Sequence, residues 1–234
     1  MTQEQMFGKG AVMVLSYKQI NDIAQGIVNR YRALKSHPCV NVNIEELLYH
    51  LYGFKIEFFN LSKDGSILGV YSSLPVGLSV FHNGKKCFVE LDGKTALIEE
   101  SLLENNIGRK NFTVAHEGAH YILNDVSGKV WFLRNELDCD KKINDWSEWQ
   151  ANTLASCILM PEDSVRYLFG KFYCSEFVEN ISPFRKELFA PFEAMADFFG
   201  VSKQAMAIRL QQLNLTNSVI LNTSILISKE DFCE

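Results

Sequence analysis

The sequence predicts an α+β fold, in which two helices and a group of strands precede a long helical region. Three observations predict it. Apolar residues recur at helical spacing in 17–35 and 44–51, five short strand-like segments fill 54–98, and helical patterns dominate from Asn111 onward. Helices and strands are therefore segregated along the chain, as in α+β domains.

The individual elements follow from local patterns. Apolar side chains from Ile20 to Tyr31 form one stripe of the first helix, and Gly53 is expected to end the second. The strand-like segments are 54–59, 67–71, 78–81, 87–91 and 95–98, with turn signals at 63–65, 83–84 and 92–93. These spacings favour a small antiparallel sheet or meander. Residues 125–145 are the least regular part, and 219–221 and 225–227 have the pattern of short strands.

Composition and charge exclude several classes of protein. The 234 residues, 47% hydrophobic and 22% charged, fit one large or two small globular domains. A net charge of −5 offers no general attraction to nucleic acid or to an anionic membrane. No apolar run approaches the ~20 residues of a membrane span, and no secretion signal is recognisable. The six scattered cysteines lack C-x-x-C spacing, so we expect reduced thiols and a cytoplasmic location.

The most informative pattern is His116-Glu117-Gly118-Ala119-His120, which has the HExxH spacing of zinc hydrolases. On a helix, His116 and His120 lie about 40° apart around the axis and one turn apart along it, so both imidazoles can bind one ion. Glu117 points about 60–100° away, where it can act as general base toward a water molecule. The alternative is a pair of core histidines satisfied by backbone carbonyls, but Glu117 would be a costly neighbour for them.

A hydrolytic zinc site needs a third protein ligand and an open fourth position. The downstream candidates are Glu136, Asp138, Asp140, Asp145 and Glu148. Glu148 is preferred because it opens a helical pattern in which Ala151 and Ala155 share its face and allow two helices to approach closely. Asn152, one turn further on, is expected to hydrogen-bond a ligand and to orient the carboxylate. The alternative for Glu148 is an exposed carboxylate favoured by the helix dipole.

The remaining histidines and cysteines are weaker candidates. His37, His50 and His82 are expected to be surface or structural residues, although His82 lies next to a predicted turn that could border the site. Cys139 is near the metal segment in sequence, but hydrolytic zinc sites seldom use thiolate where imidazole and carboxylate are available.

Two motifs resemble the ImmA/IrrE family of metallopeptidases. Residues 148–161, from Glu148 through Asn152 to Pro161, resemble the family signature E-x-x-A-N-x-(F/L)-A…L-L-M-P. Residues 108–120 resemble its G-R-R-N-F-T-x-A-H-E-x-x-H. Relatives often have a second Glu where this sequence has Gln150. This departure removes the residue that would compete with Glu148 for the role of third metal ligand. The resemblance covers most of residues 17–215.

The resemblance implies a zincin-like, gluzincin-type catalytic domain at 17–170, a helical helix-turn-helix-like region at 171–217 and a tail at 218–234. It implies Zn²⁺ bound by His116, His120 and Glu148, with Glu117 as general base. The implied activity is that of a zinc-dependent endopeptidase that cuts a helix-turn-helix transcriptional repressor. Such a cut would relieve repression in a mobile element or a stress response.

The carboxy-terminal helix pair leaves an alternative function open. Gly200 supplies its turn and Ser202 is placed to cap the second helix, as in a helix-turn-helix. A DNA reader presents several basic residues to phosphates, but here Lys203 and Arg209 are nearly alone, which argues against direct DNA binding. The alternative is a DNA- or protein-binding regulator with a structural metal site, which would need a fourth protein ligand. The sequence does not indicate an oligomeric state.

Overall fold

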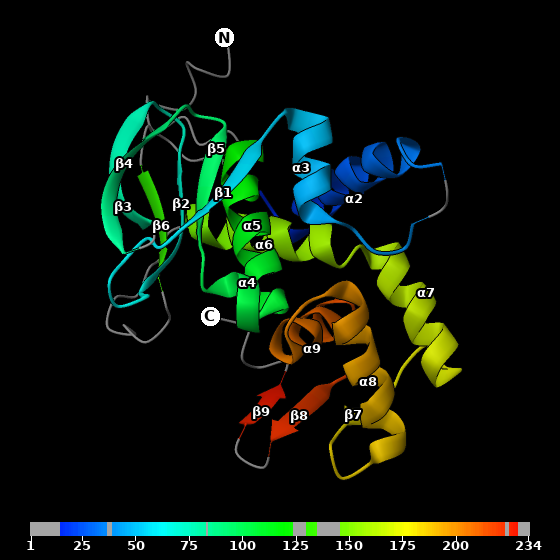
Figure 1. Ribbon diagram of the computed structural model, residues 1–234. Helices are drawn as coiled ribbons and strands as arrows, with labels where there is room; N and C mark the ends of the chain where they lie inside the picture. Colours follow the sequence, from blue (N-terminus) through cyan, green and yellow to red (C-terminus); the bar gives the residue numbers. More distant parts are fainter. Residues whose placement is uncertain are drawn as a thin grey trace.

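The computed structural model describes residues 15–36, 39–82, 84–123, 130–134, 146–222 and 225–228. They form the α+β fold that the sequence predicts, with small sheets and a larger helical part (Figure 1). The helices are α2 Tyr17–Ala33, α3 Ile44–Tyr52, α4 Leu102–Asn105, α5 Ile107–Ile122, α6 Trp146–Leu159, α7 Glu162–Tyr173, α8 Lys186–Phe199 and α9 Lys203–Gln212. The strands are β1 Lys55–Phe59, β2 Ile67–Ser72, β3 Val76–His82, β4 Lys85–Leu91, β5 Thr95–Glu99, β6 Val130–Arg134, β7 Asn180–Ile181, β8 Ser218–Asn222 and β9 Ile225–Ser228.

The two amino-terminal helices agree with the sequence prediction to within two residues. Helix α2 begins with a capping box, in which the Ser16 hydroxyl accepts from the backbone N–H of Gln19 and the Gln19 side chain accepts from that of Ser16. Helix α3 is capped by Asn43 and ends at Gly53, whose φ of 64° is a left-handed conformation that glycine adopts without strain. Local capping chemistry therefore sets their ends.

The predicted antiparallel meander is wrong. The main sheet has the order β1-β5-β2-β6, and β5 runs parallel to β1 and antiparallel to β2. Strands β3 and β4 instead form a separate hairpin. Every residue of β5 is buried, which suits a central strand, whereas exposed residues recur along β3 and β4. Strand β5 thus lies between β1 and β2, and the hairpin is displaced to a second layer.

The irregular segment expected at 125–145 contains a strand. Residues 130–134 form β6, which pairs antiparallel with β2 and is an edge of the main sheet. The strand begins with four consecutive apolar residues, from Val130 to Leu133. Such a short apolar run has no clear periodicity, so the sequence pattern did not predict a strand here.

The carboxy-terminal helix pair has the predicted turn. Helix α8 ends at Gly200, with φ 59°, and the Ser202 hydroxyl accepts from the Ala205 N–H at 3.1 Å to cap α9. The tail contributes β8 and β9, as predicted, and β7 completes their sheet.

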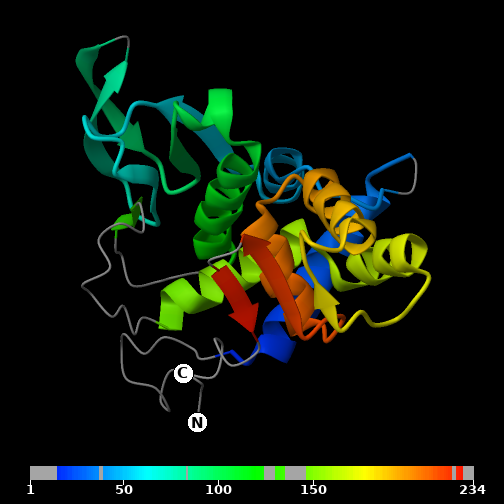
Figure 2. The ribbon, with the colours of Figure 1, turned by 90° about the horizontal axis from the view of Figure 1, so that it is seen from below.

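Arg209 ties this helix pair to the rest of the chain. It is fully buried, and its guanidinium donates to the Met160 carbonyl at 2.9 Å, to Asn21 Oδ1 at 3.0 Å and to the Tyr17 hydroxyl. The yellow and orange helices accordingly lie beside the blue helix α2, away from the β3–β4 hairpin (Figure 2).

Helix α5 packs against β2 and β5 of the main sheet, and α6 crosses α5 and also packs against α2 (Figures 1 and 2). No helix in the described ranges is long and apolar enough to span a membrane. Cys39, Cys87, Cys157 and Cys174 have free thiols.

Candidate metal centre

The packing of α5 against α6 depends on small side chains. Ala115 and Ala119 of α5 and Ala151 and Ala155 of α6 are almost completely buried. Helices with alanine at their contact can approach to the short end of the usual 8–10 Å range. Polar side chains next to this contact are therefore held close together.

Three polar side chains meet at this helix contact. His116 Nε2 lies 3.0 Å from His120 Nε2 and 3.2 Å from a Glu148 oxygen, and His120 Nε2 lies 3.4 Å from the other Glu148 oxygen. Both imidazoles are 1% exposed, whereas the Glu148 side chain is 25% exposed. The group is thus buried on the α5 side and open to solvent on the α6 side.

The donor set fits a divalent cation. Two ligand atoms on a tetrahedral zinc ion are about 3.3 Å apart, because zinc–ligand bonds are about 2.0–2.1 Å long. The three separations of 3.0, 3.2 and 3.4 Å match this value. In the part of the chain that the structure describes, these three residues form the group of donors that could hold a metal ion. Two imidazoles and one carboxylate are the protein ligands of catalytic zinc sites that keep one position open.

Asn152 hydrogen-bonds a candidate ligand, as expected, but this ligand is His116 and not the Glu148 carboxylate. His116 Nδ1 lies 2.9 Å from Asn152 Oδ1. Because an amide oxygen only accepts, the imidazole donates through Nδ1–H, which leaves a lone pair on Nε2 toward His120 and Glu148. Asn152 therefore fixes the tautomer and the ring orientation of His116.

Glu117 is completely buried between α5 and β2. Neither of its carboxylate oxygens has a hydrogen-bond partner among the described residues. A Cβ atom at Gly69 of β2 would lie 2.5 Å from Glu117 Oε1 and 2.8 Å from Thr113 Cγ2. Only glycine at position 69 leaves room for the carboxylate beneath the strand. An unpaired buried carboxylate is costly for folding alone, so a role in function explains it better.

The carboxyl groups of the site differ in acidity. Burial raises the pKa of Glu117 to about 8, and the negative charge of Glu148 adds to this effect. Burial also acts to raise the pKa of Glu148, but the close contacts with the imidazoles of His116 and His120 outweigh it and hold that pKa at about 2. Burial alone would lower the pKa of His116, but the neighbouring Glu148 and Glu117 outweigh this effect and raise that pKa overall. Glu148 is thus the anionic partner of the imidazoles, and the raised pKa of Glu117 brings this carboxyl group into the range where it can both accept and release a proton near neutral pH.

Other predicted candidates are not part of this group. The buried Gln150 accepts from the Leu15 N–H at 2.7 Å, so its amide has a structural partner. His50 is half exposed near Glu46, and His82 stacks edge-on against Phe59 at the end of β3. Several candidates lie outside the described residues: His37, Glu136, Asp138, Cys139, Asp140 and Asp145.

Gly69 and Thr113 enclose Glu117, and neither residue was predicted from the sequence to belong to the site. The Thr113 hydroxyl is also buried and has no hydrogen-bond partner among the described residues. A glycine inside a strand pattern is a signal for close approach of another segment, and Gly69 lies within the apolar run at 67–71. That signal could have indicated contact with the helix, but not with which residue.

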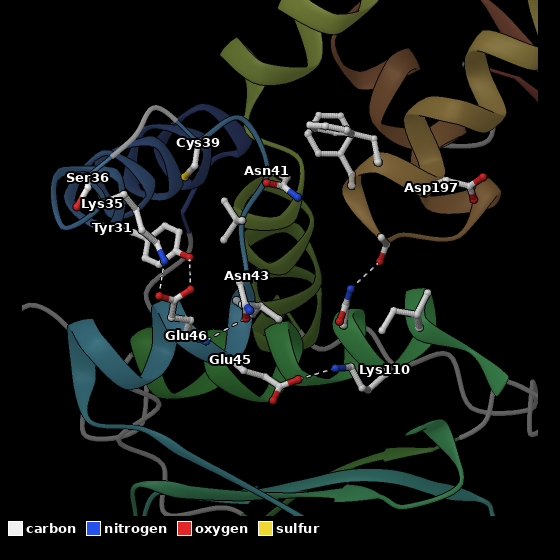
Figure 3. A pocket seen from close by; sticks show the side chains of 17 residues that line it. Tyr31, Lys35, Ser36, Cys39, Asn41, Asn43, Glu45, Glu46, Lys110 and Asp197 are labelled. Carbon is white, nitrogen blue, oxygen red and sulfur yellow. Dashed lines mark hydrogen bonds and ion pairs between the residues drawn. The ribbon is translucent and has the colours of Figure 1, made fainter. Parts of the chain in front are cut away.

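A hollow of about 950 Å³ lies elsewhere on the molecule, between α2, α3, the first turns of α5 and the end of α8 (Figure 3). The three candidate ligands do not line it. Its lysines are neutralised, because Lys35 pairs with Glu46 and Lys110 pairs with Glu45. The candidate metal centre therefore lies apart from this hollow.

Comparison with known proteins bears on the same region. Residues 103–211 match the sequence model of a peptidase family, Peptidase M78, described as the IrrE N-terminal-like domain. This range contains α5 and α6 with all the candidate ligands. No curated protein sequence matches the chain significantly. Among solved structures, a Mycobacterium tuberculosis transcriptional regulator is similar, with 12% sequence identity and a TM-score of 0.46. The alignment covers 83% of this chain and 46% of the regulator, so the chain spans less than half of that protein.

The family match and the two sequence motifs agree. Both place the helix with HExxH and the helix with Glu148 in one peptidase domain, and His116, His120 and Glu148 lie together there. Residues 103–211 therefore match a peptidase domain of the IrrE N-terminal-like type, which supports the resemblance to the ImmA/IrrE family of metallopeptidases.

Proposed function

We propose that this protein is a zinc-dependent endopeptidase with a zincin-like catalytic domain. The observation that carries the proposal is the meeting of His116, His120 and Glu148 at one point, beside a buried carboxylate on the same helix. Zinc held there would polarise the scissile carbonyl and acidify a water molecule. The donor set favours zinc, because two imidazoles and a carboxylate suit it better than they suit magnesium or calcium.

The residues of the chain have distinct roles in this proposal. His116, His120 and Glu148 bind the ion, and Asn152 holds His116 in the required tautomer. Glu117 accepts the proton of the attacking water and delivers it to the leaving amine. A carboxyl group with a pKa raised by burial is suited to both transfers near neutral pH.

The proposed substrate is a helix-turn-helix transcriptional repressor, cut at one or a few sites so that repression ends. This part of the proposal is supported by the family resemblance of the two motifs. It places the protein in the cytoplasm, in the control of a mobile element or a stress response. The α8–α9 pair, which we take as helix-turn-helix-like, then serves in packing or in substrate docking.

The rival function is that of a DNA-binding regulator with a structural metal site. The two basic residues of α9 are already engaged, since Lys203 pairs with Glu193 and Arg209 is fully buried. Neither is free to contact phosphates in this arrangement. A structural zinc site also takes four protein ligands, and the described residues supply three. Both facts support the peptidase.

The test is the Glu117→Gln variant under single-turnover conditions with excess enzyme and a co-encoded repressor. The amide keeps the shape of the side chain but cannot take a proton, so we expect wild-type zinc content and a loss of cleavage of at least about 10²–10⁴-fold. The control is Glu193→Gln, which changes a partly exposed carboxylate on α8 that is paired with Lys203. Wild-type cleavage by Glu117→Gln would show that Glu117 is not the base, and loss of zinc would show that it is a ligand. Tight, specific DNA binding that Glu117→Gln leaves unchanged, without any cleavage by the wild type, would favour the rival.

A further inference from the structure

Two tryptophans are exposed at the start of α6, on either side of Glu148. Trp146 is 56% exposed and Trp149 is 40% exposed, and their rings pack edge to face with centroids 5.6 Å apart. Edge-to-face packing of two indoles creates a rigid apolar surface that loses little freedom when it binds a ligand.

This aromatic pair lies next to the solvent-exposed side of the metal centre, on the same helix as Glu148. At about 100° per residue, Trp149 lies about 60° around the helix from Asn152, and Trp146 lies about 60° beyond Trp149. Glu148, Asn152, Trp149 and Trp146 thus follow one another around α6 toward its exposed side, while Ala155 and Ala151 lie in the opposite direction around the helix from Glu148 and are buried. The solvent-accessible edge of the candidate ligand set and the aromatic pair form one continuous surface.

We infer that Trp146 and Trp149 bind an apolar or aromatic side chain of the peptide substrate, next to the bond that is cut. The inference rests on the proposed function, because the metal centre determines where the scissile bond lies. An extended peptide advances about 3.3 Å per residue, so a residue one to three positions from the scissile bond lies over the first turns of α6. An acidic side chain there would meet indole faces and the Glu148 carboxylate, and would be disfavoured.

A purely structural role explains the pair less well. Most apolar residues of α6 that pack in the core are under 2% exposed, including Leu154, Ile158 and Leu159. The two indoles contact one another and leave about half of their surface in water. Large exposed aromatic surfaces next to a reactive centre are typical of ligand recognition.

The experiment measures peptide binding and does not depend on cleavage. The protein carries Glu117→Gln so that peptides stay intact, and the probes are acetyl-Gly-Gly-Phe-Gly-Gly-amide and the same peptide with Asp in place of Phe. Dissociation constants come from NMR titrations that observe the peptide. We expect the Phe peptide to bind about 2- to 12-fold more tightly than the Asp peptide, the range for one aromatic contact.

Variants locate that preference. Trp149→Ala and Trp146→Ala should reduce it toward unity, whereas Trp149→Phe, which keeps a ring, should retain it. Phe184→Ala is the control, because Phe184 is 76% exposed on a turn outside α6. Equal affinity for both peptides, or a preference that survives the double replacement of both tryptophans by alanine, would overturn the inference.

Failure of this inference is distinguishable from failure of the proposed function. If the peptide preference is missing while the wild type still cuts a repressor with zinc, only the role of the tryptophans is wrong. If the Glu117→Gln protein cuts a repressor as fast as the wild type, the role of Glu117 in the proposed mechanism is wrong, whether or not the peptide preference is found.

Discussion

One hydrogen bond at the metal centre orients a ligand. Asn152 accepts from His116 Nδ1–H at 2.9 Å, and this directs the Nε2 lone pair toward His120 and Glu148. The HExxH spacing predicted the two imidazoles without knowledge of the fold, because positions i and i+4 of a helix always share a face. The partner of Asn152 was not predictable, because it lies on another helix 36 residues away and depends on how α5 and α6 cross.

Replacing Asn152 by Ala should weaken zinc binding by about 10–100-fold, since the ring of His116 loses its acceptor while all three ligands remain. The measurement is a zinc titration in the presence of a competing chelator. Asn152→Asp provides the comparison, because a carboxylate can still accept from Nδ1–H and should restore most of the affinity. Unchanged affinity in Asn152→Ala would mean that the hydrogen bond does not orient a ligand.

The helices were easier to predict than the sheet. Helices α2 and α3 follow from local signals, namely apolar spacing, Ser16 and Asn43 as caps, and Gly53 at an end. Strand positions were also close, but their order was not, because β5 pairs with β1 and β2 through contacts between distant residues. No local pattern distinguishes that order from a meander. Helical spacing made Glu148 the preferred third ligand, and the family resemblance supported that choice, whereas the contact of Glu148 with both histidines could only come from the structure.

The contact between α5 and β2 makes a prediction for Gly69. In Gly69→Ala, the new Cβ would lie 2.5 Å from Glu117 Oε1, so the carboxylate or the strand must move. We expect a loss of stability of about 1–3 kcal/mol from overpacking, together with at least about tenfold slower cleavage at unchanged zinc content. Urea unfolding and single-turnover cleavage are the measurements.

Gly26→Ala is the matched control for Gly69→Ala. Gly26 lies within α2, and a Cβ there would meet nothing within 4 Å. Alanine in a helix interior should stabilise the protein by about 0.5–1 kcal/mol and leave cleavage unchanged. Equal effects of the two substitutions would contradict the account of Gly69.

At the scale of the whole molecule, the carboxy-terminal helices are bound to the amino-terminal part through buried polar contacts. Arg209 of α9 reaches Tyr17 and Asn21 of α2 and the carbonyl of Met160 after α6. From the sequence, Arg209 was counted only as one of two nearly isolated basic residues of this helix, and its burial was not predicted. Its burial depends on partners more than 180 residues away, which no local pattern reveals.

Arg209→Leu should therefore destabilise the protein by roughly 2–5 kcal/mol, because it leaves buried acceptors unpaired. For a chain of this length, the melting temperature should fall by roughly 5–15 °C. Lys203→Ala, on the same helix, removes a surface ion pair with Glu193 and a cation–π contact with Phe189, and should cost at most about 1 kcal/mol. Thermal unfolding of both variants checks this, and similar melting temperatures would show that Arg209 does not connect the two parts.

Zinc content tests the central claim most directly. The measurement is elemental mass spectrometry of the purified proteins. The wild type should carry about one zinc ion per chain, and His116→Ala, His120→Ala and Glu148→Ala should each lose most of it. Glu136→Ala and Asp145→Ala should keep wild-type zinc. Stoichiometric zinc in any of the three ligand variants, together with its loss in Glu136→Ala or Asp145→Ala, would contradict the assignment of the metal centre.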